Sequence, residues 1–418
     1  MTSDSPLPLD LLVLGGTSWL GGAVARHALA RGHRVTCLAR GESGNPPDGV
    51  SWVRADRAAA GAYTEVTARD WNVVLDVSWQ PDHVRSALAA LAERADHWIY
   101  VSSCSVYADD SVPGEAEDAA LHPAHQGTGV VPVDAYGPAK VACEEAVTAA
   151  MGADHSALAR AGLICGYGDR SDRFGYWPAR VDRAGDGEPV LVPPRDAPLQ
   201  GSDGEDLAAW LGQLAEDRVP GAFNALGAVT TVGAVLDACD AATGRRPSYV
   251  EMGDGWLAEH EVNPWMGPES LPLWLPQPEY AGFMTRRNDA ARAAGLTLRP
   301  VADTVGAALA WERERGLERD RLAGRVVSEG ISVRSLEEIV AVGDHGSDSP
   351  SPARRARPTA PALGDLAARL SDRLETRVKV DLGQRKGRIT VEFASLPDLE
   401  RIVGLIDPGH TTRERQAD

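Results

Sequence analysis

LLVLGGTSWLGG, residues 11–22 of the chain, joins a short apolar run to a glycine-rich turn. An alanine-rich stretch of helical character follows as far as Gly32, and a second apolar run occupies residues 33–38. Glycines in such a turn let the backbone come close to a pyrophosphate, and the amino end of the next helix offers it free N–H groups. The order strand, turn, helix, strand therefore predicts a parallel α/β sheet with a dinucleotide-binding turn.

A single lysine, Lys140, occurs in the first 378 residues, and Tyr136 stands four residues before it. Residues 139–150 are rich in Ala and Glu and are compatible with a helix, on which positions i and i+4 share one face. An ammonium beside a phenol favours the phenolate, which lets a tyrosine exchange protons near neutral pH. The pair therefore predicts catalysis, and the alternative is a chance pair on a solvated helix face.

These features resemble those of the extended and atypical short-chain dehydrogenase/reductase superfamily, which includes the NAD(P)-dependent epimerases and dehydratases. Within residues 8–312, Tyr136 and Lys140 match the family's Tyr-x-x-x-Lys pair, and residues 101–107 match the strand end that carries its Ser or Thr. The resemblance implies a Rossmann-type doubly wound parallel sheet with a smaller substrate-binding half. It also implies that Tyr136 is the general acid/base, that Ser103 holds the substrate oxygen, and that Lys140 contacts the nicotinamide ribose.

The resemblance implies a set of cofactor-binding residues as well. Ser18 stands where the family's middle glycine would be, as in atypical members, some of which are not known catalysts. After the second strand, Arg40 suits a ribose 2′-phosphate, so NADP(H) is the preferred cofactor and NAD(H) the alternative, unless Arg40 is an ordinary loop cation. The full set is Gly15, Gly16, Thr17, Ser18, Trp19, Leu20, Gly21, Arg40, Asp56, Asp76, Val77, Ser78, Tyr136 and Lys140.

The identity of the substrate is much less visible in the sequence. The resemblance implies a small hydroxyl or carbonyl compound, with a sugar or nucleotide sugar as one option, and leaves reduction, epimerisation and dehydration open. Aromatic side chains of the second half would stack on such a ring or pack in the core, and arginines there would meet a phosphate or stay solvated. The residues concerned are Trp177, Trp256, Trp265 and Trp274, and Arg160, Arg173 and Arg180.

The acidic charge of the chain is confined to its first three quarters. Residues 1–318 hold 25 Lys+Arg against 44 Asp+Glu, whereas residues 319–418 hold 17 against 16. A surface with such an excess of carboxylates disfavours nucleic acid. The predicted domains are 1–318, with the substrate half mainly at 165–300, then a helical segment at 319–342 broken near Gly330, a flexible linker at 343–361, and a small module at 362–408.

The small module reads as helix, hairpin and helix. Leucines recur at helical spacing over 363–374, apolar residues alternate over 378–393, and Ser395 can cap a last helix. About 45 residues of this kind scarcely form a stable core alone, so the module should dimerise. It resembles the carboxyl-terminal dimerisation domain of ParB-type chromosome-partition proteins. That family's hairpin cations can contact DNA without sequence preference, which implies the same for Lys379, Arg385, Lys386 and Arg388, with a solvated basic turn as the alternative.

Several classes of site and location are disfavoured by the sequence. The five cysteines lack metal-type spacing, so no metal site is expected, and no apolar run approaches the roughly 20 residues that cross a bilayer. The amino terminus lacks signal-peptide character, and we expect a reduced, cytoplasmic protein. Three hypotheses remain: an NADP(H)-dependent oxidoreductase or epimerase, a dinucleotide-binding protein without turnover, and a dimeric DNA-associated scaffold.

Overall fold

The computed structural model describes residues 8–267, 269–329, 378–382 and 387–391. The chain divides into two compact units, residues 1–345 and 346–418. The helices predicted at 363–374 and after Ser395, the linker, and the helical segment beyond residue 329 lie outside the described residues.

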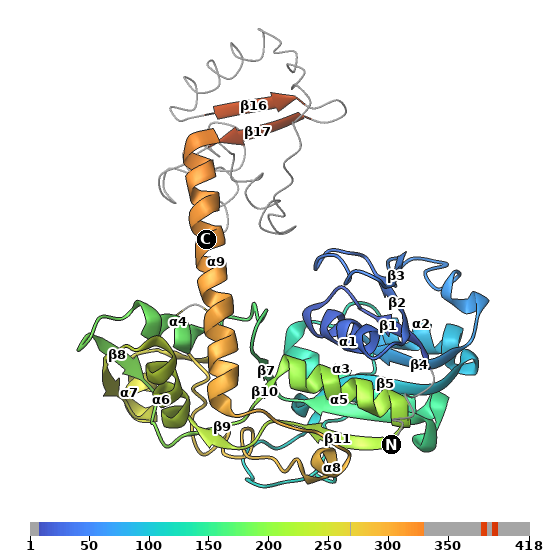
Figure 1. The fold of residues 1–418 in the computed structure, drawn as a ribbon, viewed down its shortest axis with the longest axis horizontal. Helices are drawn as coiled ribbons and strands as arrows, with labels where there is room; N and C mark the ends of the chain where they lie inside the picture. Colours follow the sequence, from blue (N-terminus) through green and yellow to red (C-terminus); the bar gives the residue numbers. More distant parts are fainter. Residues whose placement is uncertain (1–7, 268, 330–377, 383–386, 392–418) are drawn as a thin grey trace, which may run out of the picture. The chain divides into compact units, whose positions relative to one another are not determined.

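A seven-stranded parallel sheet forms the core of the first unit (Figure 1). Its strand order is β3-β2-β1-β4-β5-β6-β11. The strands are β1 (Asp10–Leu14), β2 (Arg34–Ala39), β3 (Ser51–Arg54), β4 (Trp71–Asp76), β5 (Ala95–Ser103), β6 (Ser156–Ala161) and β11 (Gly221–Ala225). Because β1 lies between β2 and β4, the strand order reverses there, and ligands of such sheets bind beyond the carboxyl ends of the strands at that point. The predicted Rossmann-type doubly wound sheet is confirmed.

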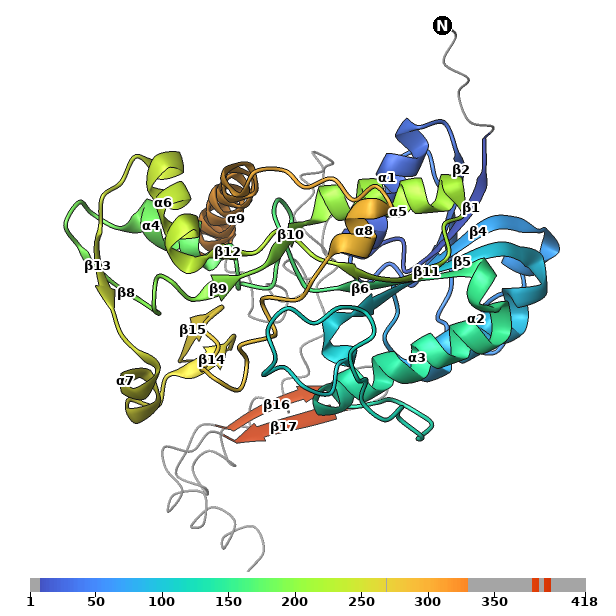
Figure 2. The same ribbon diagram turned by 90° about the horizontal axis from the view of Figure 1, so that it is seen from below.

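Helices cover both faces of this sheet (Figure 2). On one face lie α1 (Trp19–Ala30) and α5 (Gly204–Asp217), and on the other lie α2 (Pro81–Leu91) and α3 (Tyr136–Met151). Val73 and Ile99 pack toward the first pair and Val74 and Trp98 toward the second, since successive side chains of a strand alternate between faces. Burial on both faces explains why these strands are continuous apolar runs.

A second lobe of the first unit follows β6 and has its own apolar core. Its helices are α4 (Tyr176–Arg183), α6 (Val232–Thr243), α7 (Asp254–Glu259) and α9 (Val301–Glu329), while α8 (Asp289–Ala293) packs near β11. Its short strands are β7 (Leu163–Cys165), β8 (Pro189–Val192), β9 (Pro198–Leu199), β10 (Gly201–Asp203), β12 (Thr230–Thr231), β13 (Ser248–Glu251), β14 (Asn263–Trp265) and β15 (Ser270–Pro272). This lobe corresponds to the predicted smaller half.

Helix α9 continues across the boundary expected at residue 318. Its first turns pack against α4 and α6, and Arg313 of α9 forms an ion pair with Asp182 of α4. The helix runs without interruption to Glu329. The end of the second lobe and the start of the expected helical segment are therefore one element.

In the second unit, the described residues form an antiparallel hairpin of β16 (Val378–Leu382) and β17 (Gly387–Val391). Val380 is paired with Ile389, and Asp381 with Arg388. The hairpin predicted from alternating apolar residues is confirmed, whereas Arg385 and Lys386 lie outside the described residues.

Candidate active site

The glycine turn between β1 and α1 leaves no space for side chains at three positions. A Cβ on Gly15 would lie 2.5 Å from Cγ2 of Val77, and one on Gly16 would lie 2.3 Å from Sγ of Cys37. A Cβ on Gly21 would lie 2.4 Å from the carbonyl oxygen of Gly15. Gly15 also has φ of +92°, a conformation that glycine adopts without strain. The first helical turn thus packs directly on the end of β1.

Ser18 caps helix α1 at its amino end. Its hydroxyl donates to the carbonyl oxygen of Gly15 at 2.8 Å and accepts from the N–H of Gly21 at 3.2 Å. The side chain is therefore bonded to the backbone of its own turn. Next to it, the indole N–H of Trp19 donates to the carbonyl of Tyr167 at 2.9 Å, which links the turn to the second lobe.

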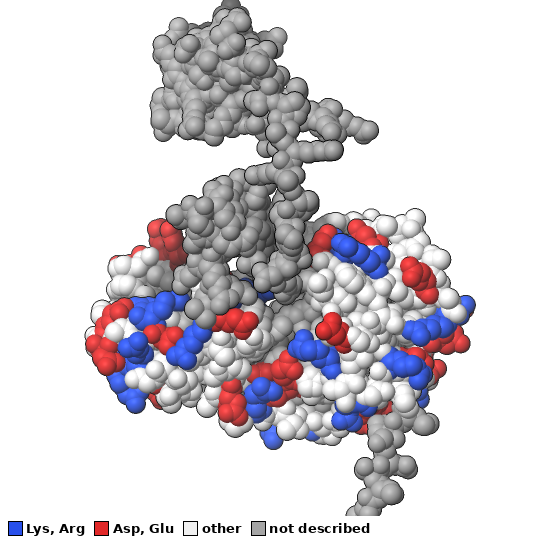
Figure 3. Space-filling view, turned by 45° about the horizontal axis from the view of Figure 1, so that its top comes forward, with Lys and Arg blue, Asp and Glu red and all other residues white. Residues whose placement is uncertain are grey.

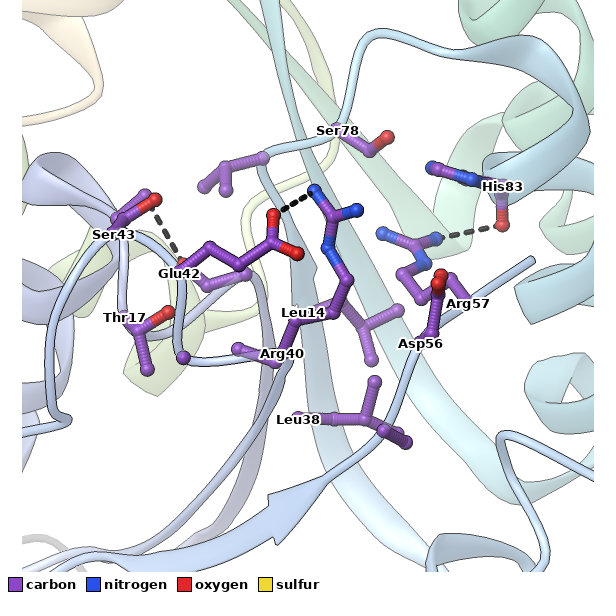
Figure 4. Close-up of a pocket in the computed structure, with 16 residues that line it drawn as sticks. Leu14, Thr17, Leu38, Arg40, Glu42, Ser43, Asp56, Arg57, Ser78 and His83 are labelled. Carbon is purple, nitrogen blue, oxygen red and sulfur yellow. Dashed lines mark hydrogen bonds and ion pairs between the residues drawn. The ribbon is translucent and has the colours of Figure 1, made fainter. Parts of the chain in front are cut away.

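A pocket lies at the carboxyl ends of β1, β2 and β4, where the sheet order reverses (Figure 4). Of the predicted cofactor-binding residues, the structure brings to its wall Gly15, Thr17, Ser18, Arg40, Asp56, Val77 and Ser78. Sequence reasoning missed other lining residues, namely Leu14, Leu38, Ala39, Gly41, Glu42, Ser43, Ala55, Arg57 and His83. Most of these neighbour a predicted residue in the chain, whereas nothing in the sequence signals His83.

Arg40 and Glu42 form an exposed ion pair at the edge of this pocket, with 2.8 Å between Nη2 and Oε2 (Figure 4). Across the pocket, Asp56 accepts a hydrogen bond from the N–H of Ala58 at 2.9 Å, which holds the turn after β3. The pocket therefore carries one exposed cation and two exposed carboxylates at the end of the second and third strands.

Asp76 is completely buried, and its carboxylate does not reach the pocket wall. Both of its oxygens accept hydrogen bonds from the guanidinium of Arg57 at 2.7 Å. Arg57 also donates to the carbonyl of His83 at 2.7 Å and to the hydroxyl of Tyr63 at 3.0 Å. Burial alone would lower the pKa of Arg57, but the charge of Asp76 raises it above its usual value. The residue that lines the pocket is thus Arg57, and Asp76 lies behind it.

The imidazole of His83 lies on the same side of the pocket as Arg57. Burial lowers the pKa of His83, and the positive charge of Arg57 lowers it further. Both effects favour the uncharged form of the ring, in which His83 still offers a hydrogen-bonding group to the pocket.

Lys140 is buried under the carboxyl ends of β4 and β5. Its Nζ donates to the carbonyl of Val101 at 2.6 Å and to that of Ser78 at 3.0 Å. The ammonium lies 4.7 Å from the ring centre of Tyr100 and 5.9 Å from that of Tyr136. Two of its three N–H bonds are used by these carbonyls, and the phenol predicted to be its partner is its neighbour on helix α3.

Ser103 ends β5 and caps the short helix η3 (Cys104–Val106). Its Oγ accepts from the N–H of Ser105 and donates to the Ser105 hydroxyl, both at 3.2 Å. A Cβ on Gly137, the residue after Tyr136, would lie 2.2 Å from the carbonyl oxygen of Ser105. The first turn of α3 therefore lies directly on the segment that begins with Ser103, and a side chain at position 137 would push the two apart.

The side chain of Tyr136 packs against Trp79, with ring centres 5.4 Å apart and planes inclined by 56°. Trp79 follows Ser78, which lines the pocket. Tyr136 and Lys140 are thus neighbours, and each is linked to the segment that follows the pocket residue Val77, Tyr136 through Trp79 and Lys140 through the carbonyl of Ser78.

Most of the aromatic residues and arginines that the sequence suggested as substrate contacts are packed in the core or form ion pairs. Trp177 and Trp274 are buried in the core of the second lobe. Arg160 is buried in an ion pair with Glu144, 2.8 Å apart, and Arg180 pairs with Glu188. Figure 3 shows basic and acidic side chains interspersed over the visible face.

Two tryptophans of the second lobe, Trp256 and Trp265, are not fully buried. Trp265 packs edge-on against Phe283, with the guanidinium of Arg173 5.4 Å from its ring centre. Trp256 stacks on His260, with 3.8 Å between ring centres. Both of these tryptophans thus have aromatic partners within the second lobe.

All five cysteines are free and buried. Burial raises the pKa of Cys37 and Cys104 to about 12 and that of Cys143 to about 11, so these thiols stay protonated at neutral pH. Among the described residues, no group of His, Cys, Asp and Glu could hold a metal ion. The helices in the described ranges include none that is long and apolar enough to span a membrane.

Family models match two parts of the chain. Residues 11–211 match the NAD dependent epimerase/dehydratase family. Residues 359–407 match the ParB dimerisation domain. Both resemblances expected from the sequence are confirmed: part of the first unit is similar to the NAD dependent epimerase/dehydratase family, and the end of the chain is similar to the ParB dimerisation domain.

Solved structures share the fold of the first unit. A putative epimerase from Burkholderia cenocepacia J2315 is 20% identical, with a TM-score of 0.56 over 74% of this chain and 99% of that one. The UDP-glucuronic acid 4-epimerase from Bacillus cereus, solved in complex with NAD, is 14% identical, with a TM-score of 0.53 over 73% of this chain and 99% of that one. At such identities the likeness establishes the fold alone.

Two curated proteins match different parts of the chain. The 2′-dehydrokanamycin reductase of Streptomyces kanamyceticus is 32% identical over 226 residues, which cover 51% of this chain and 60% of the reductase. The probable chromosome-partitioning protein ParB of Mycobacterium leprae (strain TN) is 44% identical over 95 residues, which cover 21% of this chain and 28% of that protein. The chain thus spans less than two thirds of the length of either relative.

Proposed function

We propose that the first unit is an NADP(H)-dependent oxidoreductase that acts on a hydroxyl or carbonyl group of a small, sugar-like substrate. One observation carries this proposal: Ser78 lines the pocket at the sheet reversal, and its carbonyl accepts a hydrogen bond from Lys140. Ser78 therefore connects Lys140 of the proposed catalytic pair to the expected cofactor pocket.

When bound, the nicotinamide dinucleotide supplies or accepts a hydride. In the reducing direction, the hydroxyl of Tyr136 gives its proton to the carbonyl oxygen of the substrate. The hydroxyl of Ser103 holds that oxygen, and the buried ammonium of Lys140 stabilises the phenolate that remains on Tyr136. In the oxidising direction the phenolate of Tyr136 accepts the proton of the substrate hydroxyl, while Ser103 and Lys140 keep their roles, so the arrangement serves both reduction and the oxidation step of an epimerisation.

The reducing direction is favoured by the relative that is 32% identical, since its name describes the reduction of 2′-dehydrokanamycin. We therefore propose a ketone on a sugar-like ring as the substrate. A screen of ketosugars, followed by the loss of NADPH absorbance, tests this. Tight binding of the dinucleotide without turnover of any ketone would instead favour a protein that binds the dinucleotide without catalysis. The turn capped by Ser18 is equally compatible with that function.

Arg40 is expected to make the pocket prefer NADPH to NADH. A charge-assisted hydrogen bond to a phosphate contributes about 1.5 kcal/mol, so Arg40→Ala should weaken NADPH binding about tenfold and leave NADH binding nearly unchanged. Fluorescence titration at fixed salt measures both affinities. The matched control is Arg94→Ala, which removes another exposed arginine that pairs with an aspartate. Tighter binding of NADH by the unaltered protein would contradict the preference.

The ParB-type domain is proposed to hold the protein as a homodimer. The family match and the β16–β17 hairpin support this. In sedimentation, the full chain should be a dimer, and a chain ending at residue 345, the last residue of the first unit, should be a monomer. An equally dimeric truncated chain would show that the main contact lies in the first unit.

The remaining expectations for the tail and the location of the protein stay predictions. Non-sequence-specific DNA contact through Lys379, Arg385, Lys386 and Arg388 would appear as a gel shift of residues 345–418 that weakens as salt rises. We also propose a cytoplasmic location, in keeping with a nicotinamide enzyme whose five cysteines are reduced.

A further inference from the structure

Both backbone polar groups of Ser78, its N–H and its carbonyl, form hydrogen bonds to residues that do not line the pocket. Its N–H donates to Oδ1 of Asp76 at 2.9 Å. Its carbonyl accepts from Nζ of Lys140 and from the hydroxyl of Tyr100, both at 3.0 Å. The orientation of this one residue therefore determines where an acceptor for the Lys140 ammonium lies.

The next two residues are also bonded to the surrounding structure. The side chain of Gln80 donates to the carbonyl of Val131 at 3.1 Å and accepts from its N–H at 2.8 Å. Trp79, between Ser78 and Gln80, packs on the ring of Tyr136. A rotation of the segment would therefore move both an acceptor of Lys140 and a neighbour of Tyr136.

Arg57 connects this segment to the opposite end of the pocket. Arg57 lines the pocket together with Asp56 and Arg40. It also donates a hydrogen bond to each oxygen of the buried Asp76 carboxylate. The contacts Arg57 to Asp76, Asp76 to Ser78, and Ser78 to Lys140 form one unbroken hydrogen-bonded path. It runs from the pocket wall to the catalytic ammonium.

A role in stability alone accounts poorly for this arrangement. Buried ion pairs are often no more stabilising than apolar residues of similar volume, because both charges lose their hydration. The Asp76 carboxylate, moreover, accepts from the backbone of the very residue whose carbonyl binds Lys140. Through these hydrogen bonds Asp76, held by Arg57, can fix the orientation of Ser78, which an apolar residue at position 76 could not do.

We propose that Asp76 is a positioning residue, which acts through Ser78 to direct the ammonium of Lys140 toward Tyr136 and couples that direction to the pocket through Arg57. The inference rests on the proposed function, since it deepens the part that Lys140 plays there. Asp76 is buried and does not line the pocket, so its effect on turnover is indirect.

Three variants separate positioning from stability. Asp76→Asn keeps an oxygen for the N–H of Ser78 but leaves Arg57 without its counter-charge. The double variant Asp76→Asn with Arg57→Met removes the unpaired charge as well. Glu216→Gln is the matched control, because the partly buried carboxylate of Glu216 is bonded to Arg31 and His33 next to the amino end of β2.

Asp76→Asn should lower kcat about tenfold at saturating cofactor and substrate, together with the melting temperature. The double variant should recover the melting temperature while kcat stays low. Glu216→Gln should lower only the melting temperature. Recovery of both quantities in the double variant would overturn the proposal, since kcat would then follow stability alone.

The chain offers a second measurement that needs no turnover. It has only three lysines, at positions 140, 379 and 386, so protein labelled with ¹³C,¹⁵N-lysine gives three side-chain signals. Lys379→Arg and Lys386→Arg identify the two tail signals and leave that of Lys140. Asp76→Asn should shift the Lys140 signal and Glu216→Gln should not. An unmoved signal in Asp76→Asn would refute the coupling, whereas absent turnover in the unaltered protein would refute the proposed function and leave this result standing.

Discussion

Tyr136→Phe is expected to lower turnover by about 10²–10⁴-fold, the usual contribution of a general acid/base. The substitution removes only the phenolic hydroxyl, and the ring keeps its contact with Trp79 and its place one helical turn from Lys140. No described hydrogen bond is lost, so stability should change little. The affinity for NADPH should also stay within about twofold, because the pocket wall does not include this side chain.

Steady-state kinetics and fluorescence titration on the same preparation test this pair of expectations. Tyr249→Phe is a matched control, since it removes the hydroxyl of a tyrosine on β13 that bonds to Asp240 in the second lobe. That variant should keep its turnover. Unchanged turnover in Tyr136→Phe would show that another group transfers the proton, and a large loss of NADPH affinity would show that the ring has moved.

Gly21→Ala is expected to weaken dinucleotide binding by roughly 100-fold, equivalent to about 2.7 kcal/mol. The added Cβ would lie 2.4 Å from the carbonyl oxygen of Gly15 and 2.9 Å from Oγ of Ser18. Both neighbours belong to the turn that lines the pocket, so relief of the overlap must displace that turn. Overpacking of this kind also costs about 1–3 kcal/mol of stability.

The neighbouring glycine supplies a close control for that prediction. In Gly22→Ala the new Cβ would lie 3.6 Å from the carbonyl oxygen of Gly16, which is an ordinary contact. Alanine is also the better helix former, by about 1 kcal/mol. Gly22→Ala should therefore bind NADPH normally and melt at an equal or higher temperature. Equal binding by the two variants would mean that the turn does not form the cofactor site.

Much of the fold could be predicted because its signals are local. The inner strands β1 and β4 carry apolar runs, since both faces of a parallel sheet are covered by helices. The glycine turn identified the β1–α1 junction, and the spacing of Tyr136 and Lys140 placed both on one helix, as the structure has them. These patterns involve residues close together in the sequence, so they can be recognised without knowing the tertiary contacts.

The parts that could not be predicted depend on partners distant in the chain. Asp76 was expected to contact the cofactor, but nothing near it in the sequence reveals that Arg57 donates hydrogen bonds to both oxygens of its carboxylate. Likewise, Arg160 is a lone arginine in the sequence, and only the packing of α3 on the sheet brings Glu144 to it. The continuity of α9 through residue 318 does not follow from the charge balance, which changes there, because such a change does not break a helix.

The attachment of α9 has a mechanical consequence. The helix starts against α4 and α6, and Trp311 and Arg313 fasten it to the loop after β7 and to α4. Any load carried along the backbone from beyond Glu329 therefore enters the molecule through the second lobe. In a dimer joined by the tails, as proposed above, each copy would therefore be held through the α9 helix of its second lobe.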